Sequence, residues 1–195
     1  MMKHFNIFVL SLLIGFAALA VFTSCDNSEE MVEETPRPFP RSSVFWGYFE
    51  GTVGEEQFSL SNSIQSRPVV TSSGSFQWPD SVVLFMSTGI VLREDLVMKV
   101  VLHGIDDSRS PRYITDYDYD LLETKTDCIR LITGEGVDKT YYIPDKEHPV
   151  RAEIFYVNWV TSISPMIEVL VDGVFYNQKN PLDTITVKAR YGARQ

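Results

Sequence analysis

Apolar and polar residues alternate along the C-terminal part of this chain, and this period constrains the fold more than any other feature. In DTITVKARY (183–191), every second residue from Ile185 to Tyr191 is apolar, and threonine or a basic residue stands between them. Successive side chains of a strand point to opposite faces, so the pattern predicts a strand with one face on the core. MIEVLVDGVFY (166–176) predicts another, with a bulge or bend at Gly173.

Shorter stretches rich in β-branched and aromatic residues predict the remaining strands of an all-β domain. Turn-forming residues separate them, and no window of eleven or more residues combines helical spacing with caps. The segments are FWGYFEGTVGEEQFSLSN (45–62, a hairpin turning near Gly54), SVVLFMS (81–87), DLVMKVVLHG (95–104), CIRLIT (128–133), TYYIP (140–144) and AEIFYVNWV (152–160). About nine to eleven antiparallel strands need two packed sheets or a closed barrel. We expect an antiparallel β-sandwich, with a lipocalin-like closed barrel as the alternative.

The first 24 residues have the layout of a secretion signal. Lys3 is their only Lys, Arg, Asp or Glu, and a mostly apolar run from Phe5 to Phe22 precedes two small residues and Cys25. A basic start, a short apolar middle and small residues before a boundary are typical of a cleaved signal. The run is near the lower limit for a transmembrane span, which is the alternative. We therefore predict a signal peptide at residues 1–24.

The sequence FTSC at residues 22–25 resembles the lipobox of bacterial lipoproteins, in which the cysteine becomes the new N-terminus and carries the lipid. Thr23 and Ser24 depart from the commonest Ala/Gly form but are similar to the version used by Bacteroidota. The acidic run DNSEE (26–30) is similar to the tag that sends such lipoproteins to the outer face of the outer membrane. The resemblance implies acyl chains such as palmitate on Cys25 and attachment to the outer membrane at the cell surface. The alternative is a soluble secreted protein in which Cys25 is incidental.

The segment that follows Cys25 has the composition of a tether. Residues 26–43 contain five acidic residues and no basic one up to Glu34, and then three prolines that alternate with other residues. Charge repulsion and the fixed φ of proline keep such a segment extended. The chain after the signal is long enough for one domain with a sizeable core. We predict a tether at residues 25–43 and a single β domain at residues 44–195.

The net charge limits the kinds of partner that the protein can bind, and the number of cysteines limits the disulfides that can stabilise it. The formal net charge is −9, whereas nucleic acids and anionic lipid surfaces are bound mainly through clustered Lys and Arg. We therefore expect no nucleic-acid partner. Cys128 is the only cysteine besides Cys25, so lipidation of Cys25 leaves no internal disulfide. Cys128 lies in an apolar stretch, and we interpret it as a small buried hydrophobe, not a nucleophile.

The sequence contains few signals for catalysis. The chain has no H-E-x-x-H, no paired C-x-x-C and no G-x-S-x-G motif. His103 precedes Gly104 at the end of a predicted strand, and we interpret it as a surface or hydrogen-bonded histidine. We assign no catalytic residue, metal or cofactor. Enzymatic activity stays open, because the members of a catalytic triad need not be neighbours in sequence.

One acidic stretch is a weak candidate for calcium. TDYDYDLLE (115–123) offers Asp116, Asp118 and Asp120, whose carboxylate oxygens are ligands that calcium prefers. It resembles the opening of a calcium loop only loosely, because Leu121 stands where that loop needs glycine. The simpler alternative is a period-two segment whose aspartates lie in water.

Aromatic side chains are candidates for contact with a ligand, although packing within the fold is the favoured role for the set as a whole. The flat faces of Trp and Tyr can bury a sugar ring while a polar edge stays hydrated. Trp78 lies beside a proline in an apparent loop, and Tyr141 and Tyr142 are adjacent in a predicted strand. Trp46 and Trp159 lie within predicted strands, and we expect them in the core.

These observations favour a cell-surface lipoprotein that acts as a binding or accessory module, with a host or dietary glycan as the candidate ligand. The alternative is a structural or assembly component of a surface complex or fimbria-like appendage, which contacts protein partners through edge strands or an acidic face. A third hypothesis is a hydrolase whose site the sequence does not reveal. The layout, with a glycine-interleaved hairpin near the start and a final strand pair linked by DGVFYNQKNPLDTITV (172–187), is similar to that of small lipoprotein families of unknown function from gut Bacteroidota.

Metabolic labelling with a radioactive fatty acid tests the anchor. The wild-type chain should take up label and sediment with membranes, because several acyl chains on one cysteine attach a protein stably. Cys25→Ala should remove both the label and the attachment, and Cys128→Ala should remove neither. Uptake of label by the Cys25→Ala chain would contradict the prediction.

Overall fold

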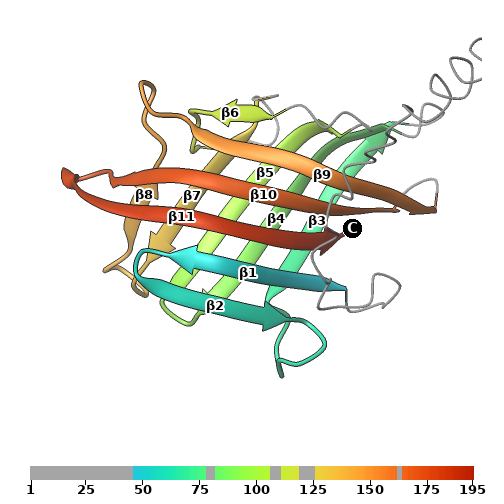
Figure 1. Ribbon diagram of the computed structural model, residues 1–195, viewed down its shortest axis with the longest axis horizontal. Coiled ribbons are helices and arrows are strands. Elements are labelled where there is room, and N and C mark those ends of the chain that lie inside the picture. Colours follow the sequence, from blue (N-terminus) through green and yellow to red (C-terminus); the bar gives the residue numbers. More distant parts are fainter. Residues whose placement is uncertain (1–45, 78–81, 106–110, 119–125, 162–163) are drawn as a thin grey trace, which may run out of the picture. The chain divides into compact units, whose positions relative to one another are not determined.

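The computed structural model describes residues 46–77, 82–105, 111–118, 126–161 and 164–195, and these residues form eleven strands in one sheet (Figure 1). The strands are β1 (Gly47–Val53), β2 (Glu56–Ser61), β3 (Val70–Gln77), β4 (Val82–Arg93), β5 (Leu96–Ile105), β6 (Arg112–Ile114), β7 (Cys128–Thr133), β8 (Thr140–Ile143), β9 (Val150–Thr161), β10 (Ser164–Asn177) and β11 (Asn180–Arg194). Within these ranges there is no helix of the length and apolarity needed to cross a membrane.

The sheet is antiparallel throughout its strand pairs, and its path is β2-β1-β11-β10-β8-β7-β5-β4-β3. Strand β9 lies beside β10, and β6 lies beside β9. Strand β10 changes partner along its length, since it pairs with β9 up to Asp172 and with β8 at Tyr176 and Asn177. The fold depends on this change of partner, because it turns the sheet over onto itself.

Gly173 lies at the point where β10 changes partner. The pairing of β10 with β11 is regular there, so Gly173 is not a bulge in that ladder. A Cβ at this position would lie 3.0 Å from the Cα of Val150, the first residue of β9. The close approach of another backbone therefore favours glycine at this position, as it does elsewhere within strands.

The two halves of the sheet form two layers whose strands cross at a steep angle (Figure 1). One layer contains β2, β1, β11, β10, β9 and β6, and the other contains β8, β7, β5, β4 and β3. Between them lies the main hydrophobic core, whose largest buried side chains include Phe49, Phe175, Tyr191, Met86, Ile90, Met98, Leu102 and Leu131. The prediction of an all-β antiparallel fold with nine to eleven strands is confirmed. The sheet is also nearly closed, so the arrangement is compatible with the barrel alternative as well.

The alternation that predicted the last two strands is present. In β11, Val187 and Tyr191 are buried, whereas Lys188 and Arg190 are exposed on the other face. The predicted hairpin at the start is also present, with Gly54 at a φ of 62° in the turn between β1 and β2. The alternation of apolar and polar residues therefore indicates which face of these strands lies on the core.

A second, smaller apolar cluster lies on the outer face of the sheet and consists of Trp46, Tyr48 and Met166. The rings of Trp46 and Tyr48 meet edge to face with centroids 5.8 Å apart, and Tyr48 pairs directly with Gly192 of β11. A Cβ at Gly192 would lie 2.4 Å from the Trp46 ring, so only glycine fits beneath it. Glu168 of β10 also lies on this outer face, yet it is only 2% exposed. Trp46 is thus buried, but outside the main core.

The two ends of the sheet path, β2 and β3, are not paired with each other: β3 passes beside β1 and β11, and the connection after β2 is bonded to its start. We call this unpaired junction the seam, and side chains close it. Directly after β2, the Asn62 amide donates from Nδ2 to the carbonyl of Val70 at 2.8 Å. Its Oδ1 accepts from the N–H groups of Val69 at 2.7 Å and Val70 at 2.8 Å. Farther along β3, the Ser72 hydroxyl donates to the carbonyl of Arg194. One amide side chain thus takes the place of a backbone ladder at this point of the seam.

Replacing Asn62 by alanine should destabilise the domain by about 2 kcal/mol, because three hydrogen bonds of modest net worth are lost at the start of β3. Urea unfolding followed by circular dichroism measures the change. Asn158→Ala is the matched control, since Asn158 is an exposed asparagine of β9. Equal stability of the Asn62→Ala and Asn158→Ala chains would show that Asn62 does not hold the seam.

Candidate functional site

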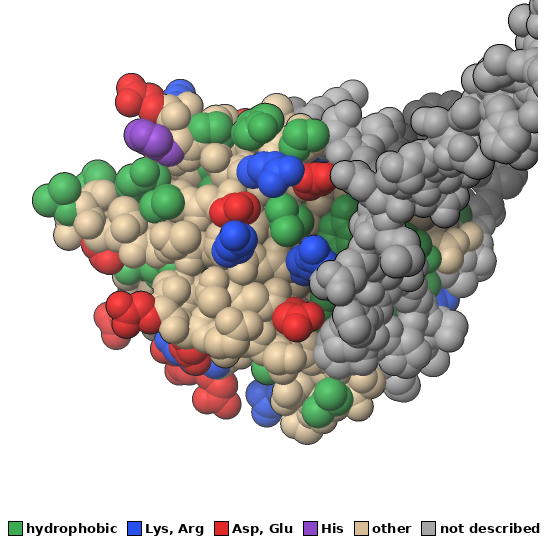
Figure 2. Space-filling model, viewed as in Figure 1, with side chains coloured by type: hydrophobic (Ala, Val, Ile, Leu, Met, Phe, Trp, Pro, Cys, Tyr) green, Lys and Arg blue, Asp and Glu red, His purple; other side chains and the backbone are tan. Residues whose placement is uncertain are grey.

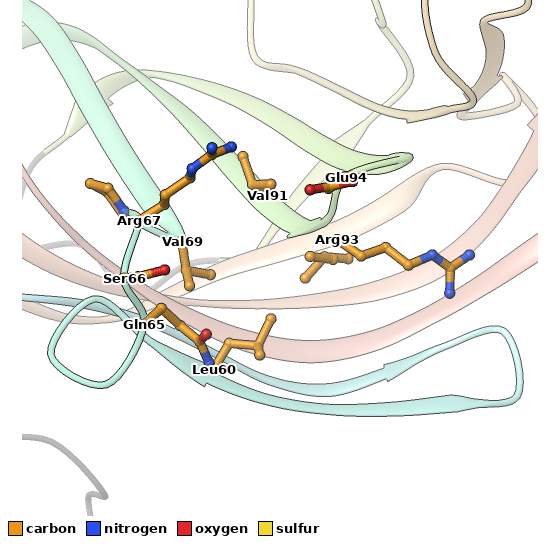
Figure 3. A pocket seen from close by; sticks show the side chains of 10 residues that line it. Leu60, Gln65, Ser66, Arg67, Val69, Val91, Arg93 and Glu94 are labelled. Atoms are coloured by element: carbon orange, nitrogen blue, oxygen red, sulfur yellow. The ribbon is translucent and has the colours of Figure 1, made fainter.

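A groove of about 400 Å³ opens at the seam, between the end of β2 and the end of β4 (Figure 3). Its lining comes from three segments that are far apart in sequence: Leu60 of β2, residues 65–69 before β3, and residues 91–94 where β4 turns into β5. The volume lies within the range of small-molecule sites. We call this hollow the seam groove.

The floor of the seam groove is apolar and belongs to the core. Val69 and Leu92 are each 5% exposed, and Leu60 packs against the same core cluster. In Figure 3, Val69 lies between Leu60 and Gln65 on one side and Arg67 and Val91 on the other. Val91 is 42% exposed, so an apolar surface is accessible from solvent.

Charged residues frame the groove, and one of its two arginines is neutralised. Arg93 bonds with Glu56 at the start of β2, and its Nε donates to Asp95 at 2.5 Å. The hydrogen bond with Asp95 is the main reason that the pKa of Arg93 is raised, and Glu56 raises it further. The Arg93–Glu56 pair links the start of β2 to the end of β4, whereas Asn62 links the end of β2 to the start of β3. The groove is therefore bounded by two polar bridges.

The two remaining charges at the rim have no such partners. Arg67 and Glu94 line the groove, and neither forms an ion pair or side-chain hydrogen bond with any residue that the structure describes. Both are exposed. The rim thus presents one available cation, one available carboxylate and the polar side chains of Gln65 and Ser66.

Tyr141 and Tyr142 lie on opposite faces of β8, as adjacent strand residues must. The Tyr142 ring packs against the core, while its hydroxyl donates to Asp183 at 2.8 Å, and Asn177 donates to the same oxygen at 2.7 Å. Burial and this carboxylate raise the pKa of Tyr142, whereas the bonds from Asn177 and Tyr142 lower that of Asp183. On the outer face, the Arg130 guanidinium lies 5.5 Å from the centre of the Tyr141 ring. The two tyrosines therefore do not share one binding surface.

The acidic stretch is described only in part. Asp116 forms an isolated parallel bridge with Cys128, and the Asp118 carboxylate lies 3.9 Å from Arg130. Among the described residues, no group of three His, Cys, Asp or Glu side chains is placed to hold a metal ion. The predicted site residues that lie outside the described ranges are Cys25, Trp78 and Asp120.

A polar cluster joins the ends of β5, β6 and β7. Arg112 donates to both carboxylate oxygens of Asp127 at 3.1 Å and to the carbonyl of Gly104 at 3.0 Å. The N–H of His103 donates to Asp127 at 2.8 Å, and its ring Nδ1 lies 3.9 Å from the same oxygen. A histidine beside an aspartate is part of a catalytic triad, but the adjacent Cys128 is buried and burial raises its pKa to about 11. The cluster is a structural tie between strands, and the interpretation of Cys128 as a buried hydrophobe is confirmed.

The outer surface of the first layer carries interspersed charges of both signs over its visible part (Figure 2). Arg151 and Glu153 of β9 form an ion pair there, and the Arg190 guanidinium lies 5.1 Å from the centre of the Phe155 ring. On the other layer, a shallow hollow of about 260 Å³ is lined by hydroxyl groups and Lys99. Neither surface combines an apolar floor with available charges, which the seam groove does.

The fold and the groove define a single-sheet antiparallel β domain with an open hollow at the seam between its edge strands. The family model described as "Domain of unknown function (DUF5025)" matches residues 46–194, and the chain belongs to this family. No curated protein and no solved structure matches the chain.

Sequence reasoning missed the residues of the seam groove. Leu60, Val69 and Leu92 each appear as ordinary apolar residues of separate segments, and only the closure of the sheet brings them together. The available signal was weak: Arg67 stands before a proline in the polar connection SNSIQSRP (61–68), where a turn and exposure are expected.

The environment of Cys128 predicts an inert thiol. With a pKa of about 11, roughly one thiol in a thousand is ionised at pH 8, and the side chain is also inaccessible. A Cys25→Ser chain should therefore fail to react with a disulfide reagent at pH 8 until guanidinium chloride unfolds it. A Val137→Cys variant is the positive control, because that position is 98% exposed. Reaction of native Cys128 as fast as the thiol introduced at position 137 would contradict the burial.

Proposed function

We propose that this protein is a lipoprotein anchored through Cys25 to the outer face of the outer membrane, where its β domain binds a glycan in the seam groove. The observation that carries the proposal is the groove itself. The exposed apolar surface of Val91 suits the C–H face of a sugar ring, and the polar rim of Gln65 and Arg67 suits its hydroxyl groups. The lipobox-like sequence and the acidic run after Cys25 support the location.

The site is held by rigid elements, as recognition requires. The N–H of Val91 donates to the carbonyl of Val69 at 2.7 Å, so the two strands that carry the floor are bonded to each other. Asn62 and the Arg93–Glu56 pair fix the third wall, β2, relative to them. A groove formed in this way is preorganised, which reduces the ordering cost of binding.

A second candidate function, assembly with protein partners, has its own supporting observation. On the side away from β10, strand β9 pairs with β6 only at residues 150–152, and its remainder pairs with no other described strand. An open strand edge can accept a strand from another chain. This alternative predicts a partner that crosslinks to β9.

A glycan array probed with the chain from residue 25 onward, carrying Cys25→Ser, tests the proposed function. Wild type should give saturable hits. Ser66→Trp should remove them without lowering the melting temperature, because Ser66 is an exposed residue of the groove lining and the larger ring would fill the hollow. Val137→Trp, at an exposed position of the β7–β8 turn, should leave them unchanged.

Two results would contradict the proposal. Hits that survive Ser66→Trp would place the site elsewhere on the domain. An absence of hits across host and plant glycans, together with a partner crosslinked to β9 on the cell surface, would favour assembly instead.

A further inference from the structure

We propose that the seam groove selects an acidic sugar, that is, a pyranose ring carrying a carboxylate, as in a uronic acid. The inference rests on the proposed function, because that function supplies the sugar; the charges at the rim supply the specificity. Three features of the groove lead to it: the available Arg67, the available Glu94, and the apolar surface between them.

Arg67 provides the anion site. The other arginine of the groove, Arg93, already bonds with Glu56 and Asp95, so its charge is balanced within the protein. Arg67 lines the groove without an ion pair among the described residues. A guanidinium fork matches a carboxylate with two parallel hydrogen bonds, and such charge-assisted bonds are about twice as strong as neutral ones. We expect a ligand carboxylate to be the partner of the Arg67 guanidinium.

Glu94 distinguishes a sugar from other anions. Its carboxylate lines the same groove and can only accept hydrogen bonds at neutral pH. A fatty acid has a carboxylate but no hydroxyl groups, so it offers no hydrogen-bond donor to Glu94. The hydroxyl groups of a sugar are donors, so an acidic sugar can place its carboxylate at Arg67 and its hydroxyls at Glu94.

The apolar surface between these charges suits the ring itself. Val91, 42% exposed, stands between Arg67 and Glu94 in Figure 3, and buried Val69 lies below it. The C–H face of a pyranose can cover this surface while its hydroxyls stay at the rim. A hollow of about 400 Å³ accommodates the end of a glycan, not a long internal stretch.

The net charge of the protein affects how tightly we expect an acidic sugar to bind. With a formal net charge of −9, the protein repels anions at long range, so attraction must come from direct contact with Arg67. We therefore expect weak binding that depends on this one side chain.

Two matched disaccharides test the inference by calorimetry on the Cys25→Ser chain from residue 25 onward. The first is α-1,4-linked digalacturonic acid; the second is α-1,4-linked digalactose, which has hydroxymethyl groups in place of the carboxylates. Wild type should bind the acidic sugar about tenfold more tightly, because one charge-assisted contact is gained. Arg67→Gln should abolish that preference, and Arg67→Lys should keep part of it. Lys179→Gln, at an exposed lysine of the β10–β11 turn, should have no effect.

The outcomes separate this inference from the function on which it rests. Equal affinity for the two sugars, a preference that survives Arg67→Gln, or equally tight binding of decanoate would overturn the acidic-sugar assignment. If neutral glycans bind as tightly as acidic ones and Ser66→Trp removes the binding of both, the proposed function stands while the inference fails. If no sugar binds at all, both fail.

Discussion

A strongly curved antiparallel sheet has two edge strands, and it must cover, pair or separate them to avoid association with other chains. In this protein the two ends of the sheet path are β2 and β3, which no backbone ladder joins, and β9 leaves a further edge open beyond β6. Asn62 bonds to Val69 and Val70 at one point, and Arg93 bonds to Glu56 at another. These bridges hold the seam, while the shared core and the pairing of β10 with strands of both layers connect the layers. The space left between the bridges is the seam groove.

Because the groove lies between these bridges, the residues that stabilise the domain differ from those that can recognise a ligand. The floor residues Val69 and Leu92 are part of the main core, so changes to them are expected to cost stability as well as binding. Arg67 and Glu94 lie at the exposed rim, where substitution has little effect on packing. Ligand preference in such a groove can therefore change through a few rim residues while the fold stays the same.

The sequence predicted the features that depend on local pattern. Period two identified the buried faces of the last strands, the turn residue Gly54 marked the first hairpin, and an apolar context placed Cys128 in the interior. It did not predict the groove, because Leu60, Arg67 and Leu92 belong to different segments and meet only through long-range pairing. The order of strands in the sheet carries that information, and no local pattern encodes it.

Amide hydrogen exchange followed by NMR tests the central claim, which is that side chains close the seam and leave the outer edge of β2 open. The bond from the N–H of Asn62 to the carbonyl of Gly47 sets the alternation of the β1–β2 ladder, so the N–H groups of Gln57 and Ser59 point away from β1. If side chains close the seam, we expect fast exchange at Gln57 and Ser59 and strong protection at Val70 and Val91. Protection of Gln57 and Ser59 equal to that of Val70 would show that backbone pairing closes the seam, and it would contradict the account.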